Sequence, residues 1–459
     1  MSKLTYPLSL HNHTDFSNFR LRDSINTVES LIDYALELGH SGVAITEHDT
    51  IASHIRAEKY YNKIKKDHPE FKLIRGNEIY LVRNGLYGQN YKKETDRYFH
   101  FILLAKDLEG HRQIREISSR AWIRSYVARR MRRVPTYYQD LIDIIGENPG
   151  HVIGCTACLG GCLPTQLLRN RDTGAPSMDL IKRWIVQMQG IFGVDDFYFE
   201  MQPSFNKDQI YVNKKLVELG EEMGIKYIIT NDAHYLKKAD RPIHKAFLNS
   251  QQGDREVDDF YATTFLMSDE EIHEYMDESL GEEVIQKAYQ TIEEIRDKCE
   301  DYSLMKSLKI PRLNWHTIDK EPTGLGYEEI FNRIPMLRTF AESPHEADNH
   351  LVKVLVDSIC KHDDIWDNQE AYDEINACLE DTWISSEVNG SRWSAYFLNL
   401  QNIIDACWDA GTLVGCGRGS GVGFILLYLL GITQINPLRE KSQTKRWRFL
   451  NPARVSVLD

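Results

Sequence analysis

The chain has 459 residues, 42% of them hydrophobic and 27% charged, and a formal net charge of -13 at pH 7. It is too long for one ordinary core, so two or three domains are expected, and its negative charge argues against a protein that coats DNA nonspecifically. Eight irregularly spaced cysteines, no secretory signal and no apolar run near the roughly 20 residues of a membrane span predict a cytoplasmic protein without a membrane segment.

The first half of the chain alternates short apolar strands with amphipathic helices. One helix is expected to begin after Thr27, a suitable N-cap, and to stop at Gly39. Buried-strand patterns recur at residues 8–10, 42–46, 73–74, 101–104, 151–153, 197–199 and 227–230. Repeated strand–helix units indicate a parallel sheet, and seven strand signals rather than eight predict a distorted parallel (β/α)7 barrel.

Possible metal ligands are spread along this same half. They are His11, His13, Asp23, His48, Glu78, His100, Cys158, Asp232 and His234. Imidazole, carboxylate and thiolate together suit zinc, manganese or iron rather than calcium. A lone buried histidine is usually an ordinary core residue, but several of these residues follow predicted strand ends, where a parallel barrel gathers its site. Because one ion needs fewer ligands, the set predicts two or three divalent ions, which would activate water and hold a phosphate.

Arginine is concentrated between residues 112 and 133, where Glu116 is the only acid. Such a run is often a solvated helix face, and a phosphate contact is the alternative. The candidates for DNA binding are Arg124, Arg129, Arg130, Arg132 and Arg133.

From about Asp254 the pattern changes to acidic helices, expected at residues 268–276 and 282–300, with Ser268 and Glu271 as a capping box. Residues 307–321 lack a clear period and are interpreted as a connector, after which helices resume. We therefore divide the chain into residues 1–250, the barrel; residues 251–325, a helical connector; and residues 326–459, which contain a second motif.

That motif is a glycine-rich loop at residues 415–423, ahead of an apolar helix expected at residues 424–430. Glycines let a backbone approach an oxyanion closely, while Arg418 and Ser420 offer donors to a phosphate. The loop lacks the Lys-Ser/Thr ending of a P-loop and does not match the dinucleotide fingerprint. A tight turn without a ligand is therefore the alternative interpretation.

These motifs together carry a family resemblance. Residues 11–14, 46–48, 76–78, 100–107, 158–160 and 231–235 resemble the polymerase-and-histidinol-phosphatase (PHP) domain of bacterial replicative DNA polymerase III alpha subunits. Residues 396–398, 413–415, 417–421, 431–433, 436–438 and 448–456 are similar to the opening of the palm in the same subunits. The resemblance implies a PHP barrel, a mostly helical region and a partial α+β polymerase palm.

The resemblance also implies roles for individual residues. The PHP ligands of the family bind up to three ions and support 3′–5′ exonuclease activity where all are retained, as they are in this sequence. Gly417, Arg418, Gly419 and Ser420 would contact the triphosphate of an incoming nucleotide. The complete palm uses Mg²⁺, and the implied partner is DNA at a primer–template 3′ end, in a bacterial or phage-encoded replication protein.

Two departures from the family pattern affect these expectations. Asp23 lies further from His13 than the family spacing suggests, so Asp15 is a rival ligand. Asp459 matches only the first acid of the palm's catalytic motif, and the sequence given stops there. We therefore expect a second polypeptide to carry the rest of the polymerase, or a truncated chain.

Two further functions remain open from the sequence. The chain could be a non-catalytic structural subunit of a split polymerase, with the barrel serving as a platform. It could instead be a freestanding phosphoesterase for a small phosphorylated metabolite, although the palm-like residues 396–456 would then have no use.

Overall fold

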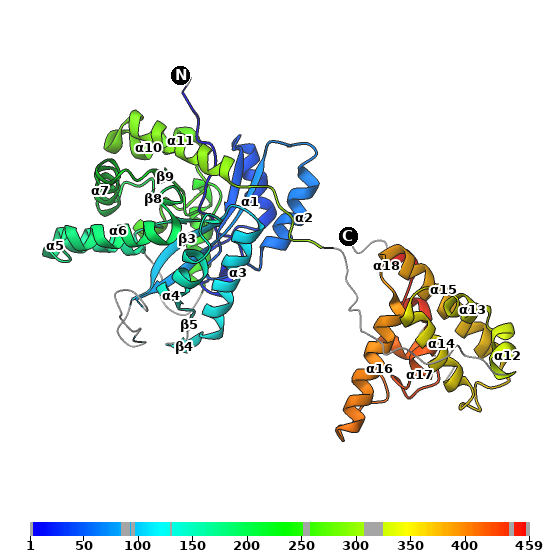
Figure 1. Cartoon of the computed structure of the whole chain (residues 1–459). Helices are drawn as coiled ribbons and strands as arrows, with labels where there is room; N and C mark the ends of the chain where they lie inside the picture. Colours follow the sequence, from blue (N-terminus) through cyan, green and yellow to red (C-terminus); the bar gives the residue numbers. More distant parts are fainter. Residues whose placement is uncertain are drawn as a thin grey trace. The chain divides into compact units, whose positions relative to one another are not determined.

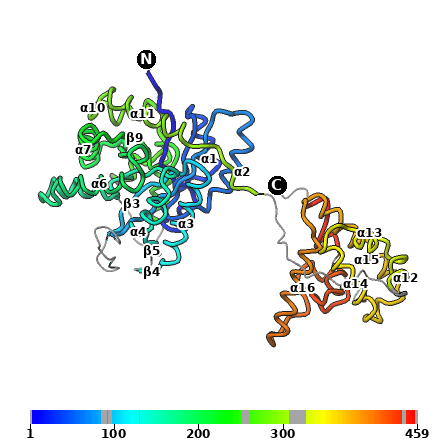
Figure 2. Tube along the Cα trace, in the orientation of Figure 1, coloured from blue at the N-terminus to red at the C-terminus, as the bar shows by residue number. Residues whose placement is uncertain are grey.

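The computed structural model describes residues 3–83, 92, 97–128, 131–250, 258–306, 325–439 and 445–455. The chain separates into two compact units, Met1–Met305 and Lys306–Asp459 (Figures 1 and 2). Each unit has its own hydrophobic core, so each is considered by itself.

Unit 1 is built around a curled sheet of seven strands. Its main path is β1-β2-β3-β7-β8-β9, and β6 lies beside β2. The bounds are β1 (Gly42–Ile45), β2 (Lys72–Val82), β3 (Phe99–Ala105), β6 (Thr136–Tyr137), β7 (Val152–Cys155), β8 (Phe197–Met201) and β9 (Tyr227–Ile229). A separate hairpin is formed by β4 (Tyr126–Ala128) and β5 (Met131–Arg133). The strands are almost entirely buried, as expected for a sheet covered on its outer face by helices.

The N-terminal segment joins the two edges of this sheet. Ser9 forms a parallel bridge with Val43 of β1, and Asn12 forms one with Ala233, just past β9. The backbone N–H of Ala44 donates to the carbonyl of Ser9, and that of His13 donates to Ala233, at 2.9 and 3.0 Å. All seven strand signals therefore take part in one curled sheet, the first of them through isolated bridges.

The strand directions differ from the parallel barrel expected from the sequence. The pairs β1–β2, β7–β8 and β8–β9 are parallel, but β3 runs antiparallel to both β2 and β7. The connection from β2 to β3 has no crossover helix among its described residues, which allows the chain to return in the opposite direction. The fold is thus a mixed α/β barrel with one reversed strand.

Helices pack around the outside of the sheet (Figure 1). They are α1 (Val28–Glu37), α2 (His54–Ile64), α3 (Leu108–Ile123), α4 (Tyr138–Leu141), α5 (Cys162–Thr173), α6 (Met178–Phe192), α7 (Lys207–Met223), α8 (Arg241–Asn249), α9 (Asp258–Tyr261), α10 (Asp269–Leu280) and α11 (Glu282–Lys298). The expected helix after Thr27 is confirmed: Thr27 and Ser30 form a capping box, and Gly39 has a φ of 76°. The capping box of Ser268 and Glu271 at α10 is also present.

Residues 258–305 belong to unit 1, whereas the sequence grouped them with a connector. The reason is long-range packing: α11 lies against β9, and Ile285, Tyr289 and Ile292 are part of the barrel's core. The apolar side of α11 was visible in the sequence, but its partner was not.

The regular elements of unit 2 are all helices within its described residues, 325–439 and 445–455. Its α-helices are α12 (Leu325–Arg333), α13 (Pro335–Ala341), α14 (Glu346–Ile359), α15 (Gln369–Asn389), α16 (Trp393–Asp409), α17 (Ile425–Leu429) and α18 (Pro452–Val455). The α+β palm is therefore not seen in this part of the chain: residues 412–415 have no strand partner, and Leu413 is 92% exposed. Across the described residues of both units, no helix has the length and apolar character needed to span a membrane.

A buried pair of histidines, one on α2 and one on α3, should make the stability of unit 1 sensitive to acid. His54 Nδ1 and His111 Nε2 are 3.0 Å apart. Burial and the nearby Arg75 lower the pKa of His111 to about 4, and burial with His111 lowers that of His54 well below its usual value. The unfolded chain binds protons at these histidines below about pH 6.5, so stability should fall from there towards pH 4.

We predict that His111→Gln makes the free energy of unfolding less dependent on pH. The slope should decrease by up to about 1.4 kcal/mol per pH unit, the contribution of one proton, in urea unfolding between pH 7.5 and 4.5. His68→Gln, at an exposed position, is the matched control and should keep the wild-type slope. Equal slopes for wild type and His111→Gln would contradict the prediction.

Candidate metal centre

The barrel brings all nine candidate ligands to one of its ends. His11 and His13 lie on the N-terminal segment, His48 follows β1, and Asp232 and His234 follow β9. The remaining four are Asp23 from the loop before α1, Glu78 within β2, His100 at the start of β3, and Cys158 after β7. Because β3 is reversed, its beginning lies at the same end as the C-termini of the parallel strands. This explains why His100 lies at the beginning of its strand, whereas other ligands follow the ends of theirs.

One part of the cluster is formed by three imidazoles and Asp23. The rings of His13 and His48 stack with centroids 4.0 Å apart, and the ring of His234 lies 4.5 Å from that of His13. Asp23 Oδ2 lies 3.2 Å from His48 Nε2 and 3.5 Å from His234 Nε2. His13, His48 and His234 each direct a ring nitrogen to a common region that could hold an ion.

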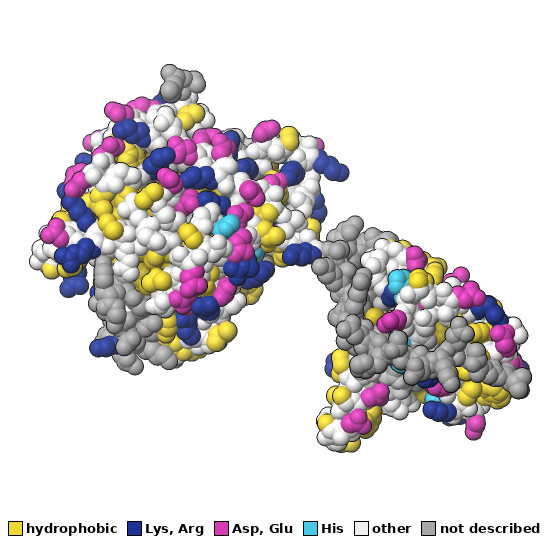
Figure 3. Space-filling model, viewed as in Figure 1, with side chains coloured by type: hydrophobic (Ala, Val, Ile, Leu, Met, Phe, Trp, Pro, Cys, Tyr) yellow, Lys and Arg dark blue, Asp and Glu magenta, His cyan; other side chains and the backbone are white. Residues whose placement is uncertain are grey.

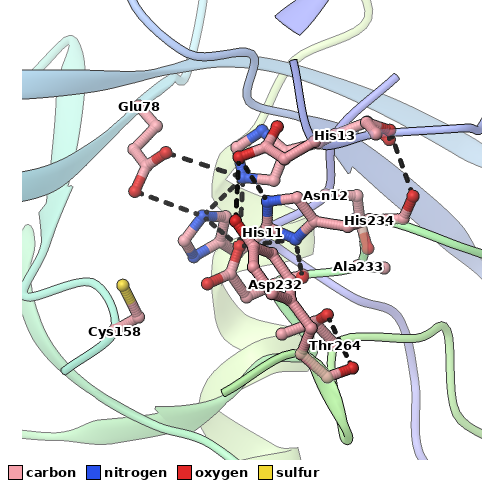
Figure 4. Close-up of polar contacts among 12 residues, drawn as sticks. His11, Asn12, His13, Glu78, Cys158, Asp232, Ala233, His234 and Thr264 are labelled. Carbon is pink, nitrogen blue, oxygen red and sulfur yellow. Dashed lines mark hydrogen bonds and ion pairs between the residues drawn. The ribbon is translucent and has the colours of Figure 1, made fainter. Parts of the chain in front are cut away.

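Glu78 links this part to the other ligands. It contacts His48, and its Oε1 lies 2.7 Å from His100 Nδ1, which is 3.4 Å from the sulfur of Cys158. The groups His11–His13–Glu78 and Glu78–His100–Cys158 are two more sets that could each hold an ion. Figure 4 shows Glu78, His11 and His13 converging, with Cys158 at the side of the cluster.

Asp232 lies between the two N-terminal histidines. Its Oδ1 is 3.2 Å from His11 Nε2 and 3.1 Å from His13 Nε2 (Figure 4). The Asp232 backbone has a φ of 50°, a left-handed conformation uncommon for residues with a side chain. Asp49 and Ala157 near the same barrel end also have positive φ, at 53° and 57°. Strained backbone of this kind is concentrated at functional sites.

Asp15, the alternative to Asp23 as a metal ligand, lies in a different environment. Asp23 is 1% exposed and contacts two histidines of the cluster, whereas Asp15 is exposed at the surface. The geometry therefore favours Asp23 as the ligand, and the longer spacing is accommodated by the loop between Phe16 and Ser24.

The carboxylates and imidazoles shift one another's titration. Burial lowers the pKa of His11, but Asp232 and Glu200 outweigh it and raise that pKa to about 9. Burial also lowers the pKa of His48, but Asp23 and Glu78 outweigh this effect and raise that pKa to about 10. His13 differs: burial and the neighbouring imidazoles lower its pKa to about 3. Without an ion, protons on His11 and His48 thus balance the buried carboxylates.

The residues present fit divalent ions. The buried atom Asp23 Oδ1 has no hydrogen-bond donor within the described chain, although buried polar atoms are normally satisfied. Burial also raises the pKa of the Cys158 thiol well above its usual value, so a nearby cation is needed for it to act as a thiolate. Crowded neutral or anionic N, O and S donors of this kind match zinc-type or manganese-type sites.

Two acids that the sequence did not single out support the histidines. Glu200 in β8 lies 2.7 Å from His11 Nδ1 and also accepts from Thr230 Oγ1 at 2.6 Å. Glu47 accepts from Ser17 Oγ, which lies 3.0 Å from His13 Nδ1. Such contacts fix which ring nitrogen faces an ion. An acid directly after the apolar pattern of residues 197–199, followed by the apolar Met201, was the signal that could have identified Glu200.

The arginine-rich stretch is largely occupied by internal contacts. Arg124 pairs with Asp140 at 2.5 Å and its guanidinium lies over the Tyr137 ring. Arg132 donates to Ser125, and Arg133 lies over the ring of Tyr98, two residues before His100. Arg129 and Arg130 lie outside the described residues. Figure 3 shows acidic and basic side chains interspersed on this face of unit 1, rather than one basic field.

The glycine-rich loop of unit 2 is exposed and needs its glycines. Gly417 has a φ of 134°, and a Cβ there would lie 2.6 Å from Val422. Gly419 has a φ of 71°, and Arg418 and Ser420 lie at or near the surface. The helix that follows, α17, is shorter than expected. Asp459 lies outside the described residues.

The chain matches known families in two regions. Residues 9–204 match the PHP domain, and residues 368–459 match the bacterial DNA polymerase III alpha NTPase domain. A DNA-directed DNA polymerase of Bacillus phage SPbeta is 35% identical over 98% of this chain and 36% of its own length. DNA polymerase III alpha subunits of Borreliella burgdorferi and Aquifex aeolicus are each 27% identical, covering 98% of this chain and 34% and 35% of their own lengths.

Residues 9–204, which carry seven of the nine candidate ligands, therefore form a PHP domain. The chain as a whole is a DNA polymerase III alpha homologue, in which this PHP domain is combined with part of the NTPase-domain region. It spans about a third of the length of the curated relatives it matches.

The placement of Asp23 and Asp15 gives a direct test. We predict that Asp23→Asn lowers the affinity for Mn²⁺ or Zn²⁺ by about 10-fold or more, or removes one ion per chain, because Asp23 contacts two histidines of the cluster. Metal content after equilibration and desalting, measured by mass spectrometry, reports both effects. Asp15→Asn is the matched control and should bind as wild type does; loss of metal in that variant alone would reverse the assignment.

Proposed function

We propose that unit 1 is a metal-dependent phosphodiesterase that removes nucleotides from the 3′ end of DNA. The observation that carries this proposal is the convergence of five imidazoles, three carboxylates and one thiol at a single barrel end, in a PHP domain of a polymerase homologue. All but His100 are essentially buried, and the His100 side chain is 23% exposed, which leaves an accessible side next to β3.

The ligand sets suggest which residues hold the ions. His13, His48 and His234 would share one ion with Asp23; His11, His13, Glu78 and Asp232 a second; and Glu78, His100 and Cys158 a third. Zinc or manganese suits these donors. When bound, such ions supply water activation at neutral pH and charge neutralisation at a phosphodiester.

The chain's own residues prepare the site for that chemistry. Glu200 holds His11 by its Nδ1, so that Nε2 faces the cluster. The Glu47–Ser17 pair does the same for His13, whose lowered pKa keeps the ring neutral and its lone pair available. Both contacts orient the histidines before any substrate arrives, which reduces reorganisation during the reaction.

We further propose that Arg132 and Arg133 guide a DNA strand to this site. The β4–β5 hairpin lies beside β3, because Tyr126 and Tyr98 share a hydrogen bond of 2.9 Å between their hydroxyls. Arg132 is exposed on that hairpin, whereas Arg124 is committed to Asp140. Phosphate contacts of this type position a strand without reading its sequence.

For unit 2 we propose a phosphate-binding role in nucleotide polymerisation. Gly417, Gly419 and Ser420 would present backbone and hydroxyl donors to a triphosphate, and Arg418 a guanidinium. A complete palm would use Mg²⁺, with Asp459 as the first of its acids. Polymerase activity then depends on residues beyond the sequence given, on this polypeptide or on a second one, acting on a primer–template.

The nuclease proposal is tested with a 3′-labelled single strand and a mismatched primer end, in the presence of Mn²⁺ or Zn²⁺. We expect the double variant Asp232→Ala, His234→Ala to lose about 100-fold or more of the 3′-nucleotide release rate, since it removes ligands from two sets.

The exposed double variant Asp67→Ala, His68→Ala is the matched control and should retain wild-type release. Bound metal without cleavage in the wild type would instead favour a non-catalytic platform. Cleavage of small phosphomonoesters but not of DNA would favour a freestanding phosphoesterase.

The loop proposal predicts that Arg418→Ala weakens binding of a fluorescent deoxynucleoside triphosphate by about 10-fold, as expected for loss of a charge-assisted hydrogen bond. Fluorescence anisotropy with the full chain measures this. Arg439→Ala removes another exposed arginine of unit 2 and should have little effect. Equal loss in both variants would indicate nonspecific charge attraction.

A further inference from the structure

A cavity lined by both polar and apolar residues adjoins the candidate metal centre in unit 1. Its volume is about 270 Å³, close to the lower end of the roughly 300–1,000 Å³ usual for small-ligand sites. Its walls include Leu159, Gln202, Asn231, Phe260 and Thr264. A second, more open hollow of about 520 Å³ shares Ser204, Asn206 and Thr263 with it. The shared residues Ser204 and Asn206 lie on the chain that follows β8.

The cavity is joined to the metal centre through the backbone. Leu159 follows the candidate ligand Cys158, and Asn231 precedes Asp232. The carbonyl of Thr264 accepts from the backbone N–H of His234 at 2.8 Å, and Figure 4 shows Thr264 next to Asp232. A group bound in the cavity would therefore lie beside the ions that act on a phosphodiester.

Two amide donors in the cavity wall have no acceptor among the described residues. They are Gln202 Nε2 and Asn231 Nδ2, on side chains that are 7% and 2% exposed. Asn231 Oδ1 accepts from the backbone N–H of Met267 at 3.4 Å, which orients its amide with Nδ2 on the opposite side. Leaving a buried donor unsatisfied costs about 1–3 kcal/mol, so a ligand that accepts from both would recover that energy.

The part of the cavity wall that carries Gln202 is held in place by residues of α7. Asn213 Nδ2 donates to the carbonyl of Gln202 at 2.8 Å, and the Asn213 side chain also accepts from Gln209 Nε2 at 2.9 Å. Both supporting residues are buried on α7. The backbone from which the Gln202 side chain projects is thus fixed before binding, as in a preorganised site.

The apolar members of the wall match a flat heterocycle. Phe260 contributes an aromatic ring and Leu159 an aliphatic side chain, while the amides and threonines contribute polar groups. A nucleobase combines a stacking face with edge acceptors, and enzymes that act on single strands bind bases by these two contacts.

We propose that this cavity binds the base of the 3′-terminal nucleotide, with Gln202 and Asn231 donating to its edge and Phe260 packing on its face. The proposal rests on the nuclease function of the neighbouring centre and adds a subsite that positions the terminal phosphodiester. Because both donors are amides on neutral side chains, the cavity accepts a base without adding charge next to the buried carboxylates.

The test measures ligand binding to the metal-free full chain by saturation-transfer NMR, so it does not depend on hydrolysis. Thymidine supplies a base without phosphate, and deoxyribose 5-phosphate supplies phosphate without a base. We expect Gln202→Met to weaken thymidine binding by about 10-fold, the loss expected for one satisfied hydrogen bond, and to weaken deoxyribose 5-phosphate much less. Phe260→Leu should also weaken thymidine and serves if Gln202→Met fails to fold.

Gln189→Met, on the outer helix α6, is the matched control and should bind thymidine as wild type does. Absence of thymidine binding, or a loss confined to deoxyribose 5-phosphate in Gln202→Met, would overturn the base subsite. The two proposals fail separately: 3′-nucleotide release without thymidine binding would leave only the nuclease, and thymidine binding without release would leave only the subsite.

Discussion

The buried carboxylates at one end of the barrel are the constraint on which unit 1 depends. Asp23, Glu78, Asp232 and Glu200 are each at most 2% exposed. A desolvated carboxylate without a partner costs several kcal/mol, so each must face an opposite charge or strong donors. The imidazoles of His11 and His48 take up that charge as protons, which divalent ions would displace. The same requirement that shapes the site therefore also holds the barrel end together.

The strand arrangement meets this constraint from several directions. The N-terminal segment joins β1 to the chain after β9, which brings His11 and His13 opposite Asp232. The reversed β3 adds His100 from its beginning rather than its end. Left-handed backbone at Asp49, Ala157 and Asp232 turns the chain sharply where strands give way to site residues. Long-range pairing holds these strained positions in place.

The two units carry different kinds of candidate site. Unit 1 has a buried cluster of candidate metal ligands with a cavity beside it. Unit 2 has an exposed glycine-rich loop on a helical core. The relatives match this chain along 98% of its length and are longer, so the same two regions occur together in those longer chains.

The sequence by itself determined the local features of this protein. Caps at Thr27 and Ser268, the seven strand signals and the ligand types follow from neighbouring residues, because they depend on short-range hydrogen bonds and apolar periodicity. The direction of β3, the docking of α11 onto the barrel and the support of His11 by Glu200 were decided only by the tertiary structure. So was the position of Asp23, rather than Asp15, beside the histidines. Each depends on contacts between residues far apart in the chain, whose geometry no local pattern specifies.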